Sequence, residues 1–226
     1  MIEYFAQSHV GLVRKGNEDS YYAPSQSRPK DPQFFLCVAD GLGGHNAGEI
    51  ASQLAVRTMV TSMQTMEGKN QMLDHPFETM QRLFFEANDK IHMLSTESEK
   101  MYGMGTTLTA AVCKKHMVCI AHVGDSRAYL FNEDGLVQIT TDHTFVQTLI
   151  QSGQLTEKAA LTHPYRHVIT RAVGIEQFLE VDFFEADWKL GDTLLLCSDG
   201  LTNMVSDEAV SYTHPDAADD TPCVDL

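Results

Sequence analysis

The sequence predicts an α+β fold in which two antiparallel sheets pack face to face, with helices outside them. The stretches 34–39 and 117–123 are apolar at successive positions, so both faces of each strand must be covered. A turn sequence at 132–135, Asn-Glu-Asp-Gly, joins the strand candidates 127–131 and 136–140 into a hairpin. A parallel sheet between helices would also cover both faces, but the hairpin and the run of consecutive strands favour antiparallel pairing.

The first half of the chain contains one strand and two helices. Residues 34–39 predict a buried strand that ends in a turn at Asp40-Gly41. Apolar residues then recur at helical spacing, which predicts a helix from about Asn46 to about Met66. A second helix follows Asp74-His75-Pro76, where Asp74 is the expected capping residue.

Strand candidates dominate the second half of the chain. They are 107–112, 117–123, 127–131, 136–140, 178–186 and 193–197. Between them, 141–175 predicts a short helix near 144–151 followed by polar sequence rich in His and Arg, which we expect to lie over the strands as an insertion. We expect the whole chain, 1–226, to form one domain that finishes in an atypical acidic tail at 206–226.

Composition narrows the class of protein. Lys and Arg number 16 and Asp and Glu number 31, which gives the 226 residues a net charge of −15. Such a chain is a poor candidate for binding nucleic acid or an anionic membrane, but it suits divalent cations if carboxylates converge. No stretch is long and apolar enough to span a bilayer, and the first residues lack the pattern of a signal peptide.

The cysteines also indicate a compartment. Four of the five lie inside apolar runs, which predicts reduced, buried thiols in a cytoplasmic protein; they are Cys37, Cys113, Cys119 and Cys197. No pair has the Cys-x-x-Cys spacing that zinc sites use.

Four short acidic motifs stand where strands are expected to end: Asn17-Glu18-Asp19, Asp40–Gly44, Gly124–Arg127 and Ser198–Gly200. In three of them an apolar run leads straight into an Asp beside a Gly, which lets an ion or ligand approach the backbone. Gathered carboxylates repel one another unless a cation neutralises them, and oxygen ligands favour Mg²⁺ or Mn²⁺. The alternative is that each Asp-Gly is only a turn.

Five segments together resemble the protein phosphatase 2C family of metal-dependent Ser/Thr phosphatases, and its bacterial branch most closely. They are Arg14–Asp19, Val38–His45, Gly105–Thr107, Val123–Arg127 and Cys197–Leu201, in family order over about residues 4–206. The resemblance implies a four-layer α-β-β-α sandwich, which agrees with the pattern analysis.

The resemblance also implies a two-metal centre of Mn²⁺ or Mg²⁺, with a third, looser ion. Asp40 would bridge both metals, and the Gly41 carbonyl would complete the second. Asp199 would bind the first metal, while Glu18 and Asp19 would hold the second directly or through water. Asp125 resembles the ligand of the third metal.

Two further residues would handle the substrate. Arg14 would grip its phosphate, because a planar guanidinium matches phosphate oxygens as Lys cannot. His45 is the candidate proton donor to the leaving alkoxide, and its alternative role is that of a solvent-facing residue at a helix start.

The segment 141–175 corresponds to the family's flap beside the active site. Its basic residues are expected either to touch phosphoprotein or only to be solvated; they are His163, Arg166, His167 and Arg171. Asp142-His143 opens the segment, where a capping role is expected. His122, on a strand, is expected to be a core histidine with its hydrogen bonds satisfied.

The sequence therefore predicts a metal-dependent protein Ser/Thr phosphatase in which a metal-bridging hydroxide attacks phosphoserine or phosphothreonine. Its expected partners are phosphorylated proteins, among them a Ser/Thr kinase. Two alternatives stay open: a catalytically weak pseudophosphatase that binds phosphoproteins, and a hydrolase of another phosphoester such as a nucleotide. Cysteine-based phosphatase chemistry is excluded, because no Cys has Arg six positions later.

The resemblance breaks at the end of the chain. The family's later Gly-Gly-x-Asp-Asn-x-Thr motif, which supplies a ligand to the first metal, is missing, so we expect a C-terminally shortened member. The substitute carboxylates available in the tail are Asp216, Asp219, Asp220 and Asp225.

Overall fold

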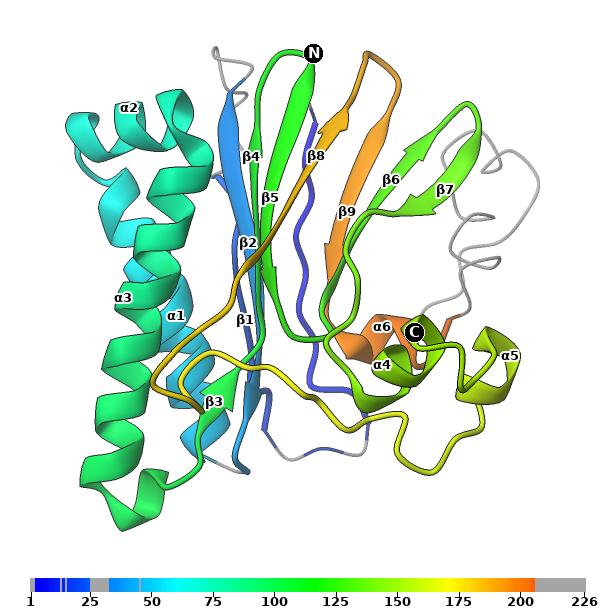
Figure 1. The fold of residues 1–226 in the computed structure, drawn as a ribbon. Helices are drawn as coiled ribbons and strands as arrows, with labels where there is room; N and C mark the ends of the chain where they lie inside the picture. The colour runs from blue at the N-terminus through cyan, green and yellow to red at the C-terminus, as the bar shows by residue number, and fades with distance from the viewer. Residues whose placement is uncertain (1–2, 13, 15, 25–32, 45, 206–226) are drawn as a thin grey trace.

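The computed structural model describes residues 3–12, 14, 16–24, 33–44 and 46–205. Two antiparallel sheets pack against each other, and a layer of long helices covers the outer face of the larger one (Figure 1). The α+β class and the two antiparallel sheets are therefore confirmed.

The larger sheet has six strands in the order β1-β2-β4-β5-β8, with β3 paired to β2. They are β1 Asp19–Tyr22, β2 Phe34–Leu42, β3 Gly105–Thr106, β4 Leu108–Cys113, β5 Met117–Val123 and β8 Asp182–Asp187. Residues of β4 and β5 are buried almost throughout, as expected for strands covered on both faces. β8 is shorter than predicted, since it begins at Asp182 instead of 178.

The smaller sheet has the order β7-β6-β9, with β6 Arg127–Asn132, β7 Gly135–Gln138 and β9 Thr193–Cys197. The predicted hairpin joins β6 to β7, and the Asp134 N–H donates to the Asn132 side chain at 2.9 Å across its turn. An apolar cluster that includes Phe34, Ile120 and Leu196 fills the space between the sheets.

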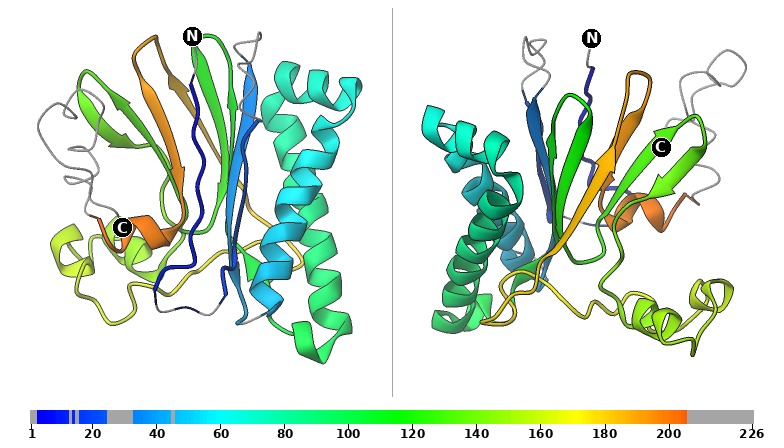
Figure 2. Two further views of the ribbon diagram at one scale, coloured as in Figure 1. Left: turned by 180° about the vertical axis from the view of Figure 1, so that it is seen from behind. Right: turned by 45° about the horizontal axis from the view of Figure 1, so that its top comes forward.

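Three helices form the outer layer: α1 Asn46–Met63, α2 Met66–Asp74 and α3 Pro76–Glu97 (Figure 2). The main core lies between this layer and the larger sheet, around fully buried Phe35, Met59 and Phe84. The prediction missed α2, which Thr65 caps by accepting the Gly68 N–H.

The capping prediction for Asp74 is wrong. Asp74 is the last residue of α2, and the residue that precedes α3 is His75, which makes no side-chain capping bond. Pro76 occupies the first turn of α3 as predicted, where its missing N–H costs nothing.

The remaining helices are short: η1 Glu99–Met101, α4 Phe145–Gln151, α5 Glu157–Ala160 and α6 Asp199–Thr202. The last three lie at one end of the sheets and not over the outer face of the smaller sheet (Figure 1). The described part of the chain thus contains three layers of the expected four.

The predictions of buried cysteine thiols and of a core histidine at His122 agree with the structure. Cys37, Cys113 and Cys119 are buried free thiols, and Cys197 is buried as well. His122 is fully buried, with Nδ1 2.9 Å from the Thr109 hydroxyl and Nε2 3.2 Å from the Thr141 carbonyl oxygen. Within the described residues, no helix combines the length and apolar character needed to cross a bilayer.

Candidate metal centre

Asp19 and Asp40 come together because β1 pairs with β2. The two residues lie directly opposite each other in the antiparallel register. Contrary to the prediction, β2 does not end in a turn at Asp40-Gly41 but continues to Leu42. The Gly41 N–H donates to the Glu18 carbonyl oxygen at 3.1 Å, which extends the pairing beyond the end of β1.

Helix α1 approaches this pairing through two glycines. A Cβ on Gly41 would stand 2.1 Å from the Gly48 carbonyl oxygen, so only glycine fits there. A Cβ on Gly48 would lie 2.6 Å from Oε2 of Glu18, so the Glu18 carboxylate occupies the space that a side chain would need. The Ser52 hydroxyl, also on α1, donates to the Glu18 carbonyl oxygen at 2.6 Å.

Asp199 enters from the other sheet, at the junction of β9 and α6. The preceding hydroxyl of Ser198 donates to Oδ2 of Asp19 at 2.9 Å and joins the two sheets at the centre. Asn203 donates to Oδ2 of Asp199 at 3.0 Å from the end of the same short helix.

Asp125 lies on the turn between β5 and β6. Gly124 has φ +114°, and a Cβ there would stand 2.6 Å from the Thr107 side chain, so the turn requires glycine. The Ser126 hydroxyl lies 2.7 Å from the Thr107 hydroxyl, which accepts the Asp40 N–H at 2.8 Å. Thr107 therefore holds the Asp125 turn against the backbone of Asp40.

The four aspartates interact electrostatically. Burial raises the pKa of Asp40 to about 9, with further increases from the charges of Asp19, Asp199 and Asp125. Burial raises the pKa of Asp125 to about 7, and Asp199 adds to it. Asp40 is only 7% exposed, so water screens this repulsion poorly.

This donor set fits a divalent cation, which would offset the repulsion and which prefers carboxylate oxygens. In the described ranges, however, no three or more His, Cys, Asp or Glu side chains are already arranged to hold a metal ion. The aspartates are gathered at one end of the sheets but are not closed around a single point.

The other predicted site residues have different outcomes. Arg14 is exposed, and its charge lowers the pKa of Asp19, although burial raises that pKa more strongly. His45 and the tail carboxylates Asp216, Asp219, Asp220 and Asp225 lie outside the described residues.

The capping prediction for Asp142-His143 is wrong, because Thr144 caps α4 by accepting the Gln147 N–H. Asp142 instead accepts a forked pair of bonds from Arg127, at 2.9 and 2.7 Å. Arg171, one of the basic residues of 141–175, is also held in place, since it donates to Asp182 at 2.7 Å and to Glu180 at 3.0 Å.

Sequence analysis assigned no role to several residues of this framework. They are Gly48, Ser52, Thr107, Ser126 and Ser198. Thr107, Ser126 and Ser198 stand inside the quoted motifs, and Gly48 carried a signal of its own, since glycine inside a helix needs a reason such as close packing.

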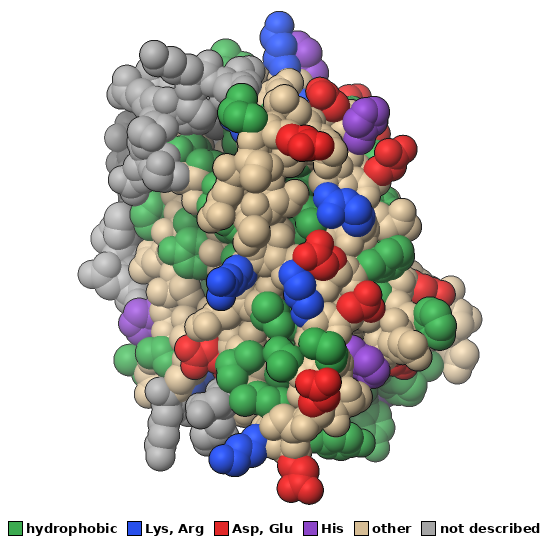
Figure 3. Space-filling model, turned by 90° about the vertical axis from the view of Figure 1, so that its left-hand side faces the viewer, with side chains coloured by type: hydrophobic (Ala, Val, Ile, Leu, Met, Phe, Trp, Pro, Cys, Tyr) green, Lys and Arg blue, Asp and Glu red, His purple; other side chains and the backbone are tan. Residues whose placement is uncertain are grey.

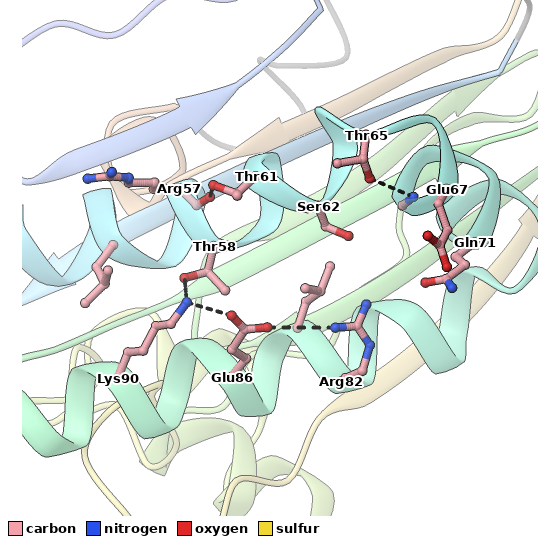
Figure 4. Close-up of a pocket in the computed structure, with 13 residues that line it drawn as sticks. Arg57, Thr58, Thr61, Ser62, Thr65, Glu67, Gln71, Arg82, Glu86 and Lys90 are labelled. Atoms are coloured by element: carbon pink, nitrogen blue, oxygen red, sulfur yellow. Dashed lines mark hydrogen bonds and ion pairs between the residues drawn. The ribbon is translucent and has the colours of Figure 1, made fainter.

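A hollow of about 570 Å³ lies elsewhere, between α1, α2 and α3 (Figure 4). Its cations Arg82 and Lys90 both pair with Glu86, and Lys90 also reaches the Thr58 hydroxyl. Acidic and basic side chains are interspersed on this helical side of the molecule (Figure 3). A smaller hollow of about 250 Å³ lies between Leu42, two residues after Asp40, and residues 169–179.

Comparisons with known proteins match most of the chain. A family model described as protein phosphatase 2C matches residues 14–219. The serine/threonine phosphatase stp of Listeria innocua is 41% identical over 196 residues, covering 86% of this chain and 76% of that protein.

Two solved structures are similar over nearly the whole chain. The Mycobacterium tuberculosis serine/threonine phosphatase PstP/Ppp has a TM-score of 0.78 at 38% identity, covering 92% of this chain and 83% of that one. The catalytic domain of the serine threonine protein phosphatase PstP in complex with two manganese ions has a TM-score of 0.75 at 36% identity, with the same coverage.

Proposed function

This chain belongs to the protein phosphatase 2C family and is a metal-dependent protein serine/threonine phosphatase, and on that premise we propose that the aspartate cluster around Asp40 is its catalytic centre. The observation that carries this assignment is the burial of Asp40 beside Asp19, Asp199 and Asp125, since burial first and their charges second raise its pKa to about 9. A buried group of like charges is unstable without a cation, so its natural role is to bind one. The names of the relatives do not favour the pseudophosphatase alternative.

We assign the metal ligands as follows. Asp40 would serve both ions and Asp199 the first. The Gly41 carbonyl, Glu18 and Asp19 would serve the second, directly or through water, and Asp125 a third. Mn²⁺ and Mg²⁺ both suit these oxygen donors. Bound cations of this kind supply an activated water and neutralise phosphate charge.

The chain's own residues would orient the substrate. Arg14 is exposed beside Asp19, so its guanidinium is free to present a fork of N–H donors to phosphate oxygens. Its proximity to the aspartates would align the phosphorus with the centre. His45 stays a sequence-based prediction for the proton that the leaving alkoxide needs.

The substrates are phosphorylated proteins, and we propose that a Ser/Thr kinase is among them. We further propose that the protein works in the cytoplasm, where its buried thiols stay reduced.

The test is hydrolysis of a phosphothreonine peptide by wild type and Asp40→Asn, with EDTA and with added Mn²⁺. Asp134→Asn is the matched control, because Asp134 is exposed in the β6–β7 turn, in the other sheet from Asp40. We expect wild type and Asp134→Asn to require Mn²⁺ and Asp40→Asn to be inactive. Activity in EDTA, or in Asp40→Asn at saturating Mn²⁺, would refute the assignment.

A nucleoside monophosphate and a nucleoside triphosphate serve as further substrates in the same assay. Faster turnover of either than of the peptide would instead support a hydrolase of another phosphoester.

A further inference from the structure

His143 makes a reciprocal pair of hydrogen bonds with Gly124, the residue before Asp125. The His143 N–H donates to the Gly124 carbonyl oxygen at 2.7 Å, and the Gly124 N–H donates to Nδ1 of His143 at 3.0 Å. His143 is 8% exposed and Gly124 is buried, so water cannot easily replace either bond. The imidazole therefore fixes the turn that carries Asp125.

The far side of the imidazole is fixed as well. Because Nδ1 accepts a hydrogen bond from the Gly124 N–H, the neutral ring carries its proton on Nε2, which lies 3.1 Å from Oδ2 of Asp182. Nη1 of Arg171 also lies 3.1 Å from Nε2, and it donates to the other oxygen of Asp182 at 2.7 Å. The ring also packs against that of buried His122, with centroids 4.8 Å apart and the two planes tilted by 34°. Four neighbours thus leave His143 a single orientation.

The backbone of His143 connects this arrangement to the segment 141–175. The Thr170 N–H donates to the His143 carbonyl oxygen at 2.8 Å, and an isolated bridge pairs Thr144 with Ile169. One residue therefore joins three parts of the chain: the Asp125 turn, residues 168–171 of the insertion and β8.

We propose that His143 is a positioning residue, which holds the Asp125 turn against residues 168–171 so that the Asp125 carboxylate is aimed at the metal centre. This inference rests on the proposed role of Asp125 as a metal ligand. It predicts that loss of the Gly124–His143 bonds loosens the turn and weakens metal binding at Asp125, while the chemistry at Asp40 survives.

The experiment uses four variants of the full chain. His143→Leu removes the acceptor for the Gly124 N–H, whereas His143→Asn keeps an amide oxygen near the position of Nδ1. His163→Asn is the matched control, because His163 lies in the same segment and bonds to the Tyr165 N–H instead. Asp125→Ala reports the effect of losing the ligand itself.

Three readouts separate positioning from general destabilisation. Hydrogen–deuterium exchange in EDTA measures opening of the amides at 124–126 and 168–170. Calorimetry measures Mn²⁺ binding directly, and turnover of a phosphothreonine peptide gives kcat at saturating Mn²⁺.

For His143→Leu we expect faster exchange confined to these two stretches and a loss of roughly tenfold in affinity for the weakest-bound Mn²⁺, as for other residues that orient metal ligands. Asp125→Ala should produce the same calorimetric change, His143→Asn should recover most of it, and His163→Asn should keep the wild-type exchange and the wild-type Mn²⁺ affinity.

The proposal is overturned if His143→Leu binds Mn²⁺ like His163→Asn, or if its faster exchange spreads evenly over both sheets. If His143→Leu does not fold, His143→Asn is measured in its place. A Mn²⁺ affinity between those of wild type and Asp125→Ala, with faster exchange only at 168–170 and at Gly124, would support the proposal. Wild-type affinity, or faster exchange over both sheets, would overturn it. Unchanged Mn²⁺ binding in Asp125→Ala would refute the ligand role on which the inference rests, whereas a change in Asp125→Ala alone would refute only the positioning role.

Discussion

Replacing Thr107 by Val tests whether the metal centre and the fold depend on the same hydroxyl group. Thr107 is fully buried; its hydroxyl oxygen accepts the Asp40 N–H at 2.8 Å and lies 2.7 Å from the Ser126 hydroxyl. Val has nearly the same shape, so the change removes these hydrogen bonds and leaves the packing almost unaltered. Two buried polar groups then lose a partner.

The expected cost follows from these contacts. Each buried group left without a partner costs about 1–3 kcal/mol. The Ser126 hydroxyl can rotate, which moves the total toward the lower end, and we expect Thr107→Val to lower the free energy of unfolding by about 2–4 kcal/mol. For a chain of this size, the unfolding temperature should fall by roughly 4–16 °C.

Urea unfolding in EDTA measures this effect without a contribution from bound metal. Thr107→Ser is the control, because it keeps the hydroxyl and removes one methyl group, at a cost of about 1 kcal/mol. The Mn²⁺ concentration that gives half-maximal peptide hydrolysis is measured on the same samples. It should differ from the wild-type value more in Thr107→Val than in Thr107→Ser. Equal stability of the two variants would refute the reasoning that these bonds hold Asp40 in place.

Three other changes have defined outcomes. Arg14→Lys should lower kcat/KM for a phosphothreonine peptide by roughly tenfold, because a forked contact with phosphate becomes a single one. The urea midpoint should stay at the wild-type value. An unchanged kcat/KM would exclude Arg14 from phosphate binding. Gly48→Ala should displace the Glu18 carboxylate and destabilise the fold by about 1–3 kcal/mol, which urea unfolding and Mn²⁺ calorimetry would detect together. Burial lowers the pKa of His122 from 6.5 to about 3. Between these two pH values the folded chain therefore binds fewer protons than the unfolded chain. The free energy of unfolding should fall as the pH drops below about 6.5, by up to about 1.4 kcal/mol per pH unit. Urea unfolding at pH 5, 6 and 7 should give a flatter slope for His122→Asn, and an equal slope would assign the acid sensitivity to other groups.

The elements that could be predicted from the sequence are those with a strong local pattern. The strands at 117–123 and 193–197 have the predicted bounds, because their apolar runs are flanked by polar residues and turns. Helix α2 was missed because its residues 66–74 show little apolar periodicity, and its stability comes from the Thr65 cap and packing on α3. Local pattern cannot reveal a helix that depends on a neighbour.

The candidate site divides in a similar way. The aspartates could be found from short motifs, since each stands at the expected end of a strand or beside one and three have a glycine next to them. The groups that orient them could not, because Thr107 and Ser126 are 19 positions apart and neither residue type signals its partner. The turn expected at Asp40-Gly41 was wrong for the same reason, since the pairing that continues β2 comes from the distant Glu18 carbonyl.

The bond between Ser198 and Asp19 has a consequence for the order in which the molecule folds. The two residues are separated by 179 positions, so their contact closes one of the longest loops in the described chain. Contacts of such high sequence separation form late, after local helices and hairpins have reduced the entropy that loop closure costs. During synthesis, the carboxylates of β1 and β2 can join the completed aspartate cluster only after β9 and α6 have left the ribosome. Metal capture should therefore coincide with the slowest step of refolding, and a cation present from the beginning would stabilise the finished chain more than it accelerates its formation.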